Sequence, residues 1–290
     1  MRFAHLGPRS GSEARLAVVI DDRAVFTDDL MDDAPVDLQQ LIEREVDLRE
    51  LEAATKDAAA RPELWHPVSD LRHYSAVSRP PVILAIGANY AAHSAELALK
   101  VEKAATVFAL WPNSLAPHEG TTAWPAELSN EVDYEAELGV IIGKPARNVS
   151  VLDALDYVFG YTVVNDITAR NLQFSEAQWS RCKSFDGFTP TGPVVVTADQ
   201  IRDPQDLWLS TTVDGRLLQD ASTGGMVRSV AELIAFLSRS TTLLPGTLIS
   251  TGSPGGAGYS RTPPVFLQNG SRVTVTCSGI GSLTTYCRVV

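Results

Sequence analysis

The sequence is poor in cysteine, in basic residues and in long apolar runs, and each shortage narrows the class of protein. Its three cysteines, Cys182, Cys277 and Cys287, are an odd number without Cys-x-x-Cys spacing, which fits reduced thiols in a cytoplasmic protein. No apolar run approaches the roughly 20 residues of a membrane span. The first residues also lack the apolar segment of a signal peptide.

Basic side chains are outnumbered by acidic ones. Lys and Arg number 24 against 35 for Asp and Glu, a formal net charge of −11. Nucleic acid and anionic membranes are therefore not expected as partners, because both bind clusters of basic side chains.

The sequence does contain enough apolar material for a core. Of its 290 residues, 44% are hydrophobic and 20% are charged, which is typical of a folded chain rather than a disordered one. At roughly 100–200 residues per domain, one large domain and one small domain are expected.

The first 75 residues differ in pattern from the rest. Acidic residues crowd this region and are interpreted as a solvated face. Prolines interrupt the chain at Arg79-Pro80-Pro81, so we place a boundary near residue 75, between a small N-terminal α/β domain (1–75) and a larger domain (76–290). The expected strands are Arg2–Leu6, Leu16–Ile20 and Ala24–Thr27, and the expected helices lie near Val36–Arg44 and Leu48–Ala60.

The larger domain is expected to be α+β, built around mixed or antiparallel β-structure. Its strands do not alternate regularly with long helices, which disfavours a doubly wound parallel sheet. Capping-box patterns at Ser150-x-x-Asp153 and Ser229-x-x-Glu232 predict helices over Ala154–Val158 and Leu233–Ser238. The expected strands are Val82–Ile86, Leu138–Ile142, Tyr161–Val164, Val194–Thr197, Leu207–Val213, Thr247–Thr251, Arg272–Cys277 and Leu283–Val289.

Three carboxylates are the first candidate site. Glu135 and Glu137 project to the same side of a strand, where they repel each other unless a cation lies between them. Asp166 follows the strand Tyr161–Val164 and precedes a helix expected over Thr168–Trp179. A solvated strand end and a helix N-cap are the alternatives. Three carboxylates suit a hard divalent cation, Mg²⁺, Mn²⁺ or Ca²⁺, rather than Zn²⁺.

Three further segments are ambiguous when taken alone. His93 and Glu96 share one face of a helix. This arrangement fits a catalytic base and the carboxylate that orients it, and it equally fits a simple contact on the protein surface. A single Lys183 carries no information by itself. The glycine-rich stretch Thr251 to Gly258 lacks the Lys-Ser/Thr of a phosphate-binding loop, so it indicates a tight turn, and contact with a ligand there is one of two open alternatives.

Together and in order, these segments resemble the fumarylacetoacetate hydrolase family, in particular its bacterial two-oxo-acid and acylpyruvate hydrolase members. The family patterns are G-x-N-Y-x-x-H-x-x-E, V-D-Y-E-x-E-L-x-V-V-I-G, G-Y-x-x-x-N-D-x-[ST]-A-R-D-x-Q, [KR]-S-F-D and T-G-T-P-x-G-V-G. Versions of all five lie within residues 82–290. The resemblance implies a mixed β-sandwich roll with short helices, a small N-terminal domain and a homodimer.

The resemblance also implies roles for individual residues. Glu135, Glu137 and Asp166 match the family's metal carboxylates, usually around Mg²⁺ or Mn²⁺. His93 and Glu96 match a water-activating dyad on a segment that closes over the site. The residues that match substrate-holding or charge-stabilising positions are Arg170, Gln173, Lys183 and Ser253.

Three positions depart from the family patterns. Leu110 stands where a lysine is usual, which predicts a weaker grip on a charged end of the substrate or room for a bulkier, less charged one. Asn171 replaces an aspartate and Ser253 replaces a threonine. None of the three removes an expected metal ligand.

The expected activity is hydrolysis of a carbon–carbon bond in an acylpyruvate-like 1,3-diketo acid. A cation bound to adjacent carboxylate and 2-oxo oxygens would stabilise the charge that develops on bond breaking, and the His93–Glu96 dyad would activate water. Decarboxylation, isomerisation or hydration of a related 2-oxo acid uses the same chelate and is the alternative. A non-catalytic binding protein is a further alternative, supported by Leu110.

Overall fold

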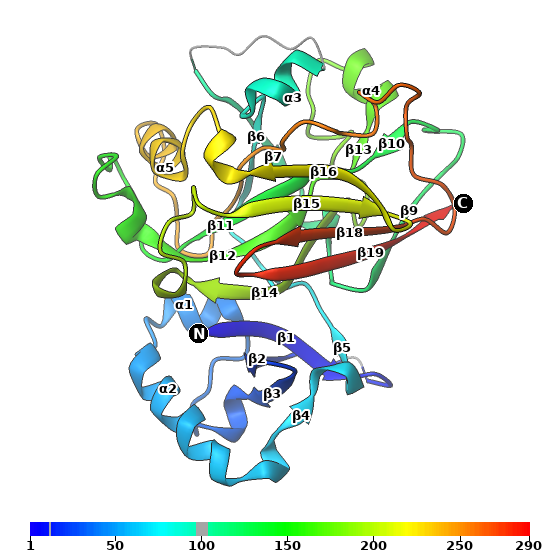
Figure 1. The fold of residues 1–290 in the computed structure, drawn as a ribbon. Coiled ribbons are helices and arrows are strands. Elements are labelled where there is room, and N and C mark those ends of the chain that lie inside the picture. The colour runs from blue at the N-terminus through cyan, green and yellow to red at the C-terminus, as the bar shows by residue number, and fades with distance from the viewer. Residues whose placement is uncertain (12, 97–103) are drawn as a thin grey trace.

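The computed structural model describes residues 1–11, 13–96 and 104–290, and its two large β-sheets pack against each other (Figure 1). Strands β11, β12 and β14 of the larger sheet contact β15, β18 and β19 of the smaller one. The apolar side chains of both sheets form one continuous core between them. This is the α+β β-sandwich architecture that the sequence predicted.

The larger sheet has the path β4-β3-β2-β1-β14-β12-β11-β17-β6-β7, with β5 beside β1 and β8 beside β14. Its strands are β1 (Arg2–Pro8), β2 (Arg15–Ile20), β3 (Arg23–Phe26), β4 (His66–Pro67), β5 (Leu71–His73), β6 (Ile83–Gly87), β7 (Thr106–Leu110), β8 (Leu115–Ala116), β11 (Ala136–Ile142), β12 (Val158–Asn165), β14 (Thr189–Thr197) and β17 (Leu248–Ser250). Most neighbours are antiparallel, but β17 and β6 are parallel, so the sheet is mixed.

The smaller sheet has the order β16-β15-β18-β19-β9. Its strands are β9 (Gly120–Trp124), β15 (Trp208–Val213), β16 (Arg216–Ser222), β18 (Arg272–Cys277) and β19 (Gly281–Val289). A short separate pair joins β10 (Val132–Asp133) to β13 (Thr168–Ala169).

The helices are short and lie outside the sandwich. They are α1 (Leu38–Glu43), α2 (Leu48–Asp57), α3 (Ala91–Glu96), α4 (Arg170–Ser175) and α5 (Val230–Ser238). The predicted capping box is present at α5, where Ser229 and Glu232 each bond the other's backbone. Within the described ranges, none of the helices has the length and hydropathy needed to cross a membrane.

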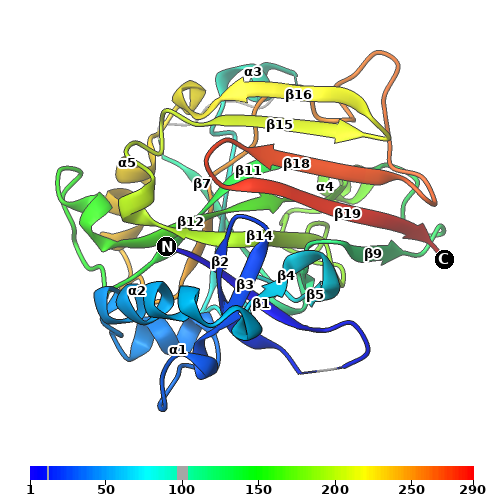
Figure 2. The same ribbon diagram turned by 60° about the horizontal axis from the view of Figure 1, so that its bottom comes forward.

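The N-terminal segment extends the larger sheet. Strand β1 pairs with β14 in antiparallel register, with Phe3 opposite Val195, while α1 and α2 lie beside β1 to β3 (Figure 2). A buried cluster that includes Phe3, Leu41 and Leu51 covers this side of the sheet. The domain boundary near residue 75 stays a prediction, because the hydrogen-bonded sheet continues across it.

Two of the predicted helices differ from the prediction in length or type. The stretch expected as a helix over Thr168–Trp179 begins as strand β13, and α4 covers only Arg170–Ser175. The backbone near its start is used in pairing instead, since Ala169 lies opposite Val132 and Arg170 N–H donates to Glu131. The helix expected over Ala154–Val158 is a single 3-10 turn, Ala154–Tyr157, followed directly by β12.

Candidate metal and substrate site

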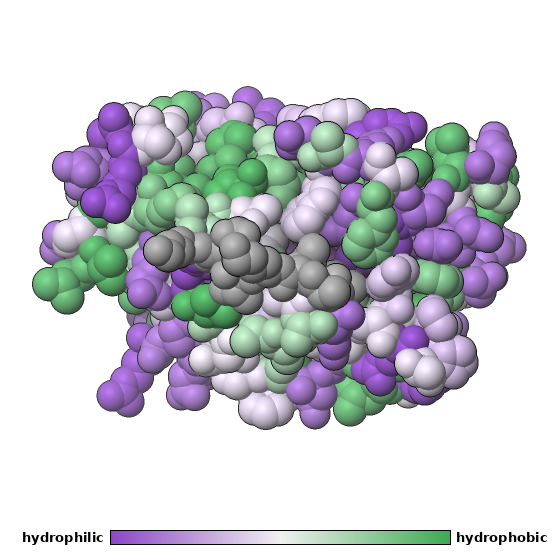
Figure 3. Space-filling view, turned by 90° about the horizontal axis from the view of Figure 1, so that it is seen from above, coloured by the Kyte–Doolittle hydropathy of each residue, from purple (hydrophilic) through white to green (hydrophobic). Residues whose placement is uncertain are grey.

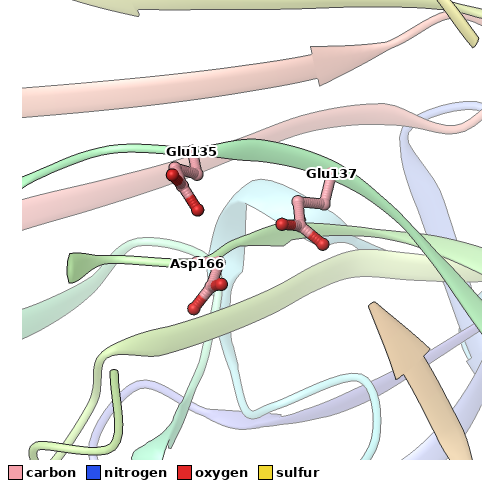
Figure 4. A group of neighbouring side chains, drawn as sticks. All are labelled: Glu135, Glu137 and Asp166. Atoms are coloured by element: carbon pink, nitrogen blue, oxygen red, sulfur yellow. The ribbon is translucent and has the colours of Figure 1, made fainter. Parts of the chain in front are cut away.

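The three predicted carboxylates converge. Glu135, Glu137 and Asp166 each present an oxygen, and these oxygens lie within 4.8 Å of one another (Figure 4). The side chains are 3%, 2% and 1% exposed. Glu137 belongs to β11 and Glu135 precedes it, so alternation along the strand turns both to one side. Asp166 joins them because β11 and β12 are paired and Asp166 N–H donates to the Glu135 carbonyl at 2.9 Å.

Lys183 is a buried cation that contacts two of the three carboxylates. Its Nζ donates to Glu135 Oε2 at 2.8 Å, to Asp166 Oδ2 at 2.6 Å and to Thr168 Oγ1 at 2.8 Å. Burial by itself lowers the pKa of Lys183, but the charges of Asp166 and Glu135 outweigh it and raise the pKa above its usual value. The ammonium group therefore stays charged inside the site.

Arg170 is fully buried and bonds three side chains. Nε donates to Asp133 Oδ1 at 2.7 Å, Nη2 to Glu135 Oε1 at 2.6 Å and Nη1 to Gln173 Oε1 at 2.8 Å. The sequence predicted Arg170 and Gln173 as substrate contacts. The structure places Arg170 behind Glu135, where its fork orients the carboxylate, and places Gln173 on the cavity wall.

Glu137 is held by hydrogen bonds from the end of β17 and the loop that follows it. Its Oε2 accepts from Ser250 Oγ at 2.6 Å and from Gly252 N–H at 2.7 Å. Gly252 has a φ of +96°, and a Cβ there would lie 2.7 Å from the Asn89 Cβ. Glycine is therefore required for the backbone N–H to reach Glu137.

The three acids differ in their affinity for protons. Burial by itself raises the pKa of Glu135, but Arg170 and Lys183 hold it well below its ordinary value. Burial and the charges of Asp166 and Glu135 raise the pKa of Glu137 well above its ordinary value. Burial and the charge of Glu135 also raise the pKa of Asp166 to about 6, against the opposing effect of Lys183. Glu137 and Asp166 therefore bind a proton more readily than Glu135 does.

The donor set fits a hard divalent cation. Asp166 Oδ1 is buried and has no hydrogen-bond partner among the described residues, although buried carboxylate oxygens are normally bonded. A cation between the three carboxylates would satisfy this oxygen and offset the repulsion among them. All-oxygen ligation suits Mg²⁺, Mn²⁺ or Ca²⁺.

His93 and Glu96 lie one turn apart on α3 but point to different partners. His93 Nε2 lies 3.1 Å from Glu135 Oε1, and its Nδ1 is buried without a hydrogen-bond partner in the described part of the chain. Glu96 Oε2 instead accepts from Gly256 N–H at 2.8 Å and from Ser260 Oγ at 3.0 Å. In this conformation Glu96 fastens α3 to the glycine-rich loop, and the predicted pairing of His93 with Glu96 stays a prediction.

The three carboxylates, Lys183 and His93 line a narrow cavity of about 10 Å³, room for roughly one water molecule. It lies under the face that carries α3 and α4, where hydrophobic and hydrophilic residues intermix (Figure 3). The lining residues are Ile86, Gly87, Ala88, His93, Phe108, Glu135, Glu137, Asp166, Gln173, Trp179, Lys183 and Ser253. A larger surface hollow of about 480 Å³ beside α5 is lined by other residues and contains none of the predicted site.

Sequence reasoning missed the aromatic wall of the cavity. The rings of Phe108 and Trp179 meet edge to face with centroids 5.5 Å apart. Gly87 gives Trp179 its space, since a Cβ at Gly87 would lie 2.4 Å from the indole. The position of Trp179 four residues before Lys183 was visible in the sequence, but nothing in that spacing indicated that both would face one cavity.

The departures from the family patterns lie in different places. Leu110 is 3% exposed, packs in an apolar cluster opposite Ile83 and is not among the cavity-lining residues. Asn171 bonds the loop before β10, through Ser129 and Leu128. Ser253 alone of the three faces the cavity. What Leu110 does to substrate choice stays a prediction.

The comparisons with known proteins assign the chain to a family. Residues 82–289 match the model of the fumarylacetoacetate (FAA) hydrolase C-terminal domain. The chain therefore belongs to the fumarylacetoacetate hydrolase family, as its motifs indicated. An uncharacterised protein of Staphylococcus aureus is 38% identical over 239 residues, which are 82% of this chain and 79% of that protein.

Solved structures share the fold over the whole chain. Fumarylacetoacetate hydrolase from Exiguobacterium antarcticum is 32% identical with a TM-score of 0.85, and each chain is covered completely. Maleylpyruvate hydrolase from Sphingobium sp. SYK-6, in complex with manganese(II) and pyruvate, is 29% identical with a TM-score of 0.82, covering 100% of this chain and 99% of that one. The 2-hydroxyhepta-2,4-diene-1,7-dioate isomerase of Mycobacterium marinum is 27% identical with a TM-score of 0.75, covering 100% and 98%.

Proposed function

We propose that the chain is a divalent-metal-dependent hydrolase that cleaves a carbon–carbon bond in an acylpyruvate-like 1,3-diketo acid. The observation that carries the proposal is the convergence of three buried carboxylates, Lys183 and His93 on one cavity. Glu135, Glu137 and Asp166 would hold Mg²⁺ or Mn²⁺, with Ca²⁺ as a further candidate. When bound, the cation would supply positive charge where negative charge develops on the 2-oxo acid.

Lys183 would add a second positive charge at the same place. Its Nζ is fixed by Glu135, Asp166 and Thr168, so little reorganisation is needed when charge develops on the substrate. Lys183 lines the cavity and Arg170 does not, so Lys183 is the better candidate for direct contact with the substrate.

His93 would act as the base that activates water. Glu135 is ionised, so Nε2 of His93 carries the proton and donates to it, which leaves the lone pair on Nδ1. Nδ1 has no other partner among the described residues and is therefore the atom available to take a proton. A positioned base of this kind contributes on the order of 10²–10⁴-fold to the rate.

The cavity also limits how the substrate enters. Its volume of about 10 Å³ is smaller than any diketo acid, so side chains around it must move on binding. Glu96 holds α3 against Gly256 and Ser260, and release of these two bonds would let the helix move. A 2-oxo acid is the proposed small-molecule partner, and the homodimer and the cytoplasmic location stay predictions.

The similar solved structures support a hydrolase, and they also include an isomerase, which is the alternative activity. One is a maleylpyruvate hydrolase that holds manganese and pyruvate, and another is an isomerase. Isomerisation, decarboxylation or hydration of a 2-oxo acid would use the same carboxylates and Lys183. Hydrolysis is preferred because His93 lines the cavity and its Nδ1 has no hydrogen-bond partner among the described residues.

A substrate panel tests the proposal. Acetylpyruvate, fumarylpyruvate and oxaloacetate would each be incubated with the protein and Mg²⁺, and again with EDTA. Metal-dependent loss of diketone absorbance with release of pyruvate supports hydrolysis. Release of CO₂ from oxaloacetate alone would favour the decarboxylase, and no turnover on a wider panel would contradict an enzymatic role.

A further inference from the structure

The Gln219 side chain has its amide orientation fixed by its neighbours. It lies in β16 and is 1% exposed. Oε1 accepts from Ala136 N–H at 2.9 Å and Thr211 Oγ1 at 2.8 Å, while Nε2 donates to the Pro254 carbonyl and to Ser253 Oγ, both at 2.9 Å. A backbone N–H can only donate and a backbone carbonyl can only accept, so Oε1 and Nε2 cannot be exchanged.

This orientation determines how the Ser253 hydroxyl is used. Because Oγ accepts from Gln219 Nε2, the hydroxyl hydrogen must be donated elsewhere. The described protein acceptor near it is the Pro254 carbonyl at 3.4 Å, a long distance for an O–H···O bond, and that oxygen already accepts from Gln219. Ser253 lines the cavity, so the hydrogen is free to bond a ligand oxygen there.

We infer that Gln219 is a positioning residue that makes Ser253 a hydrogen-bond donor to an oxygen of the bound 2-oxo acid. The inference rests on the proposed function and adds to it one hydrogen bond in which Ser253 is the donor and the substrate oxygen is the acceptor. The same amide also holds Ala136, which separates Glu135 from Glu137. Gln219 thus couples the smaller sheet to both the carboxylates and the loop that carries Ser253.

No motif singled out Gln219. It lies outside all five family patterns, on a strand of the other sheet, 34 residues before Ser253 in the chain. Only the packing of β16 against the start of β11 brings its amide to Ser253.

A double-mutant cycle on ligand affinity tests the inference. Gln219→Glu keeps the shape but places an acceptor opposite Ser253, so the hydroxyl turns its hydrogen toward residue 219 and away from the cavity. The probe is oxalate, titrated calorimetrically into protein loaded with Mn²⁺, for the wild type, Gln219→Glu, Ser253→Ala and the double variant. Mn²⁺ affinity and the melting temperature are measured for each.

Gln219→Glu and Ser253→Ala should each weaken oxalate binding about tenfold or more, the loss expected for a hydrogen bond to a charged group. In the Ser253→Ala background, Gln219→Glu should cost much less, because the hydroxyl through which it acts is gone. Ser253→Thr keeps the hydroxyl and should bind within about threefold of the wild type. Gln205→Glu is the matched control, since Gln205 bonds Thr223 and Val230 and none of the three lines the cavity, and it should not change oxalate affinity.

Equal losses from Gln219→Glu in both backgrounds would overturn the inference, because an added charge or a packing fault acts without Ser253. If Gln219→Glu does not fold, Gln219→Met takes its place. It should lose less affinity, since the hydroxyl can then also turn to Pro254, and a loss unaffected by Ser253→Ala would again contradict coupling. A wild-type protein that binds neither Mn²⁺ nor oxalate contradicts the proposed function itself.

Discussion

Nε of Arg170 lies 2.7 Å from Oδ1 of Asp133, and both side chains are fully buried. Asp133 Oδ2 also accepts from Tyr259 N–H at 2.8 Å, so the pair joins the strand before Glu135 to the loop between β17 and β18. Through Nη2 the same guanidinium holds Glu135. The position of one carboxylate of the cluster therefore depends on an ion pair behind it.

Removing the Arg170 guanidinium should lower the free energy of unfolding substantially. Arg170→Met leaves Asp133 and Glu135 buried without their main counter-charge, which typically destabilises a protein by about 3–5 kcal/mol. Urea unfolding measures the change. The control is Arg181→Met, which removes the partly exposed ion pair with Glu176 and should cost less than about 1 kcal/mol. Equal costs for the two variants would show that burial of the Arg170 pair is unimportant.

Glu137→Ala should abolish metal binding and metal-dependent activity but leave the fold intact, because two carboxylates cannot hold the cation as three do. Calorimetry with Mn²⁺ gives the affinity. Mn²⁺ at about 100 times its dissociation constant should stabilise the wild type by about 2.7 kcal/mol and the variant not at all. Glu127→Ala, on an exposed loop, is the control. Undiminished Mn²⁺ affinity in Glu137→Ala would refute its role as a ligand.

His93→Ala should suppress hydrolysis by about 10²–10⁴-fold and change Mn²⁺ affinity much less, since His93 contacts Glu135 from outside the carboxylate cluster. Steady-state rates on the active diketo acid and Mn²⁺ titrations separate the two effects. His66→Ala, in the N-terminal strand β4, should retain the full rate. Hydrolysis that survives the loss of His93 would remove it from the role of base.

His73 should make stability depend on pH. Burial, and then the charge of His118 4.7 Å away between ring centroids, lowers the pKa of His73 from 6.5 to about 4. Since the folded state binds this proton less readily than the unfolded state, the contribution is fully present above pH 6.5 and is lost as the pH falls toward 4. The shift corresponds to about 3 kcal/mol at most.

Urea unfolding of the wild type and of His73→Phe at pH 7.5, 6 and 5 checks this. The wild type should lose more stability than the variant over that range. The same loss in both proteins would assign the pH dependence to other groups, such as His5, whose pKa burial also lowers.

The sequence alone determined those features that depend only on residues close together in the chain. Alternation along a strand put Glu135 and Glu137 on one side, and the Ser229–Glu232 capping box marked the start of α5. These predictions depend on residues two or three positions apart, whose relative directions follow from the geometry of one strand or one helix turn.

The tertiary structure alone decided what those residues meet. Asp166 reaches Glu135 because Ala136 pairs with Asn165, and Gln219 reaches Ser253 because two sheets pack together. Arg170 turns to Asp133, and Glu96 to the loop rather than to His93. Strand register and the direction of a long side chain are set by packing between segments far apart in the chain, and no local pattern encodes them.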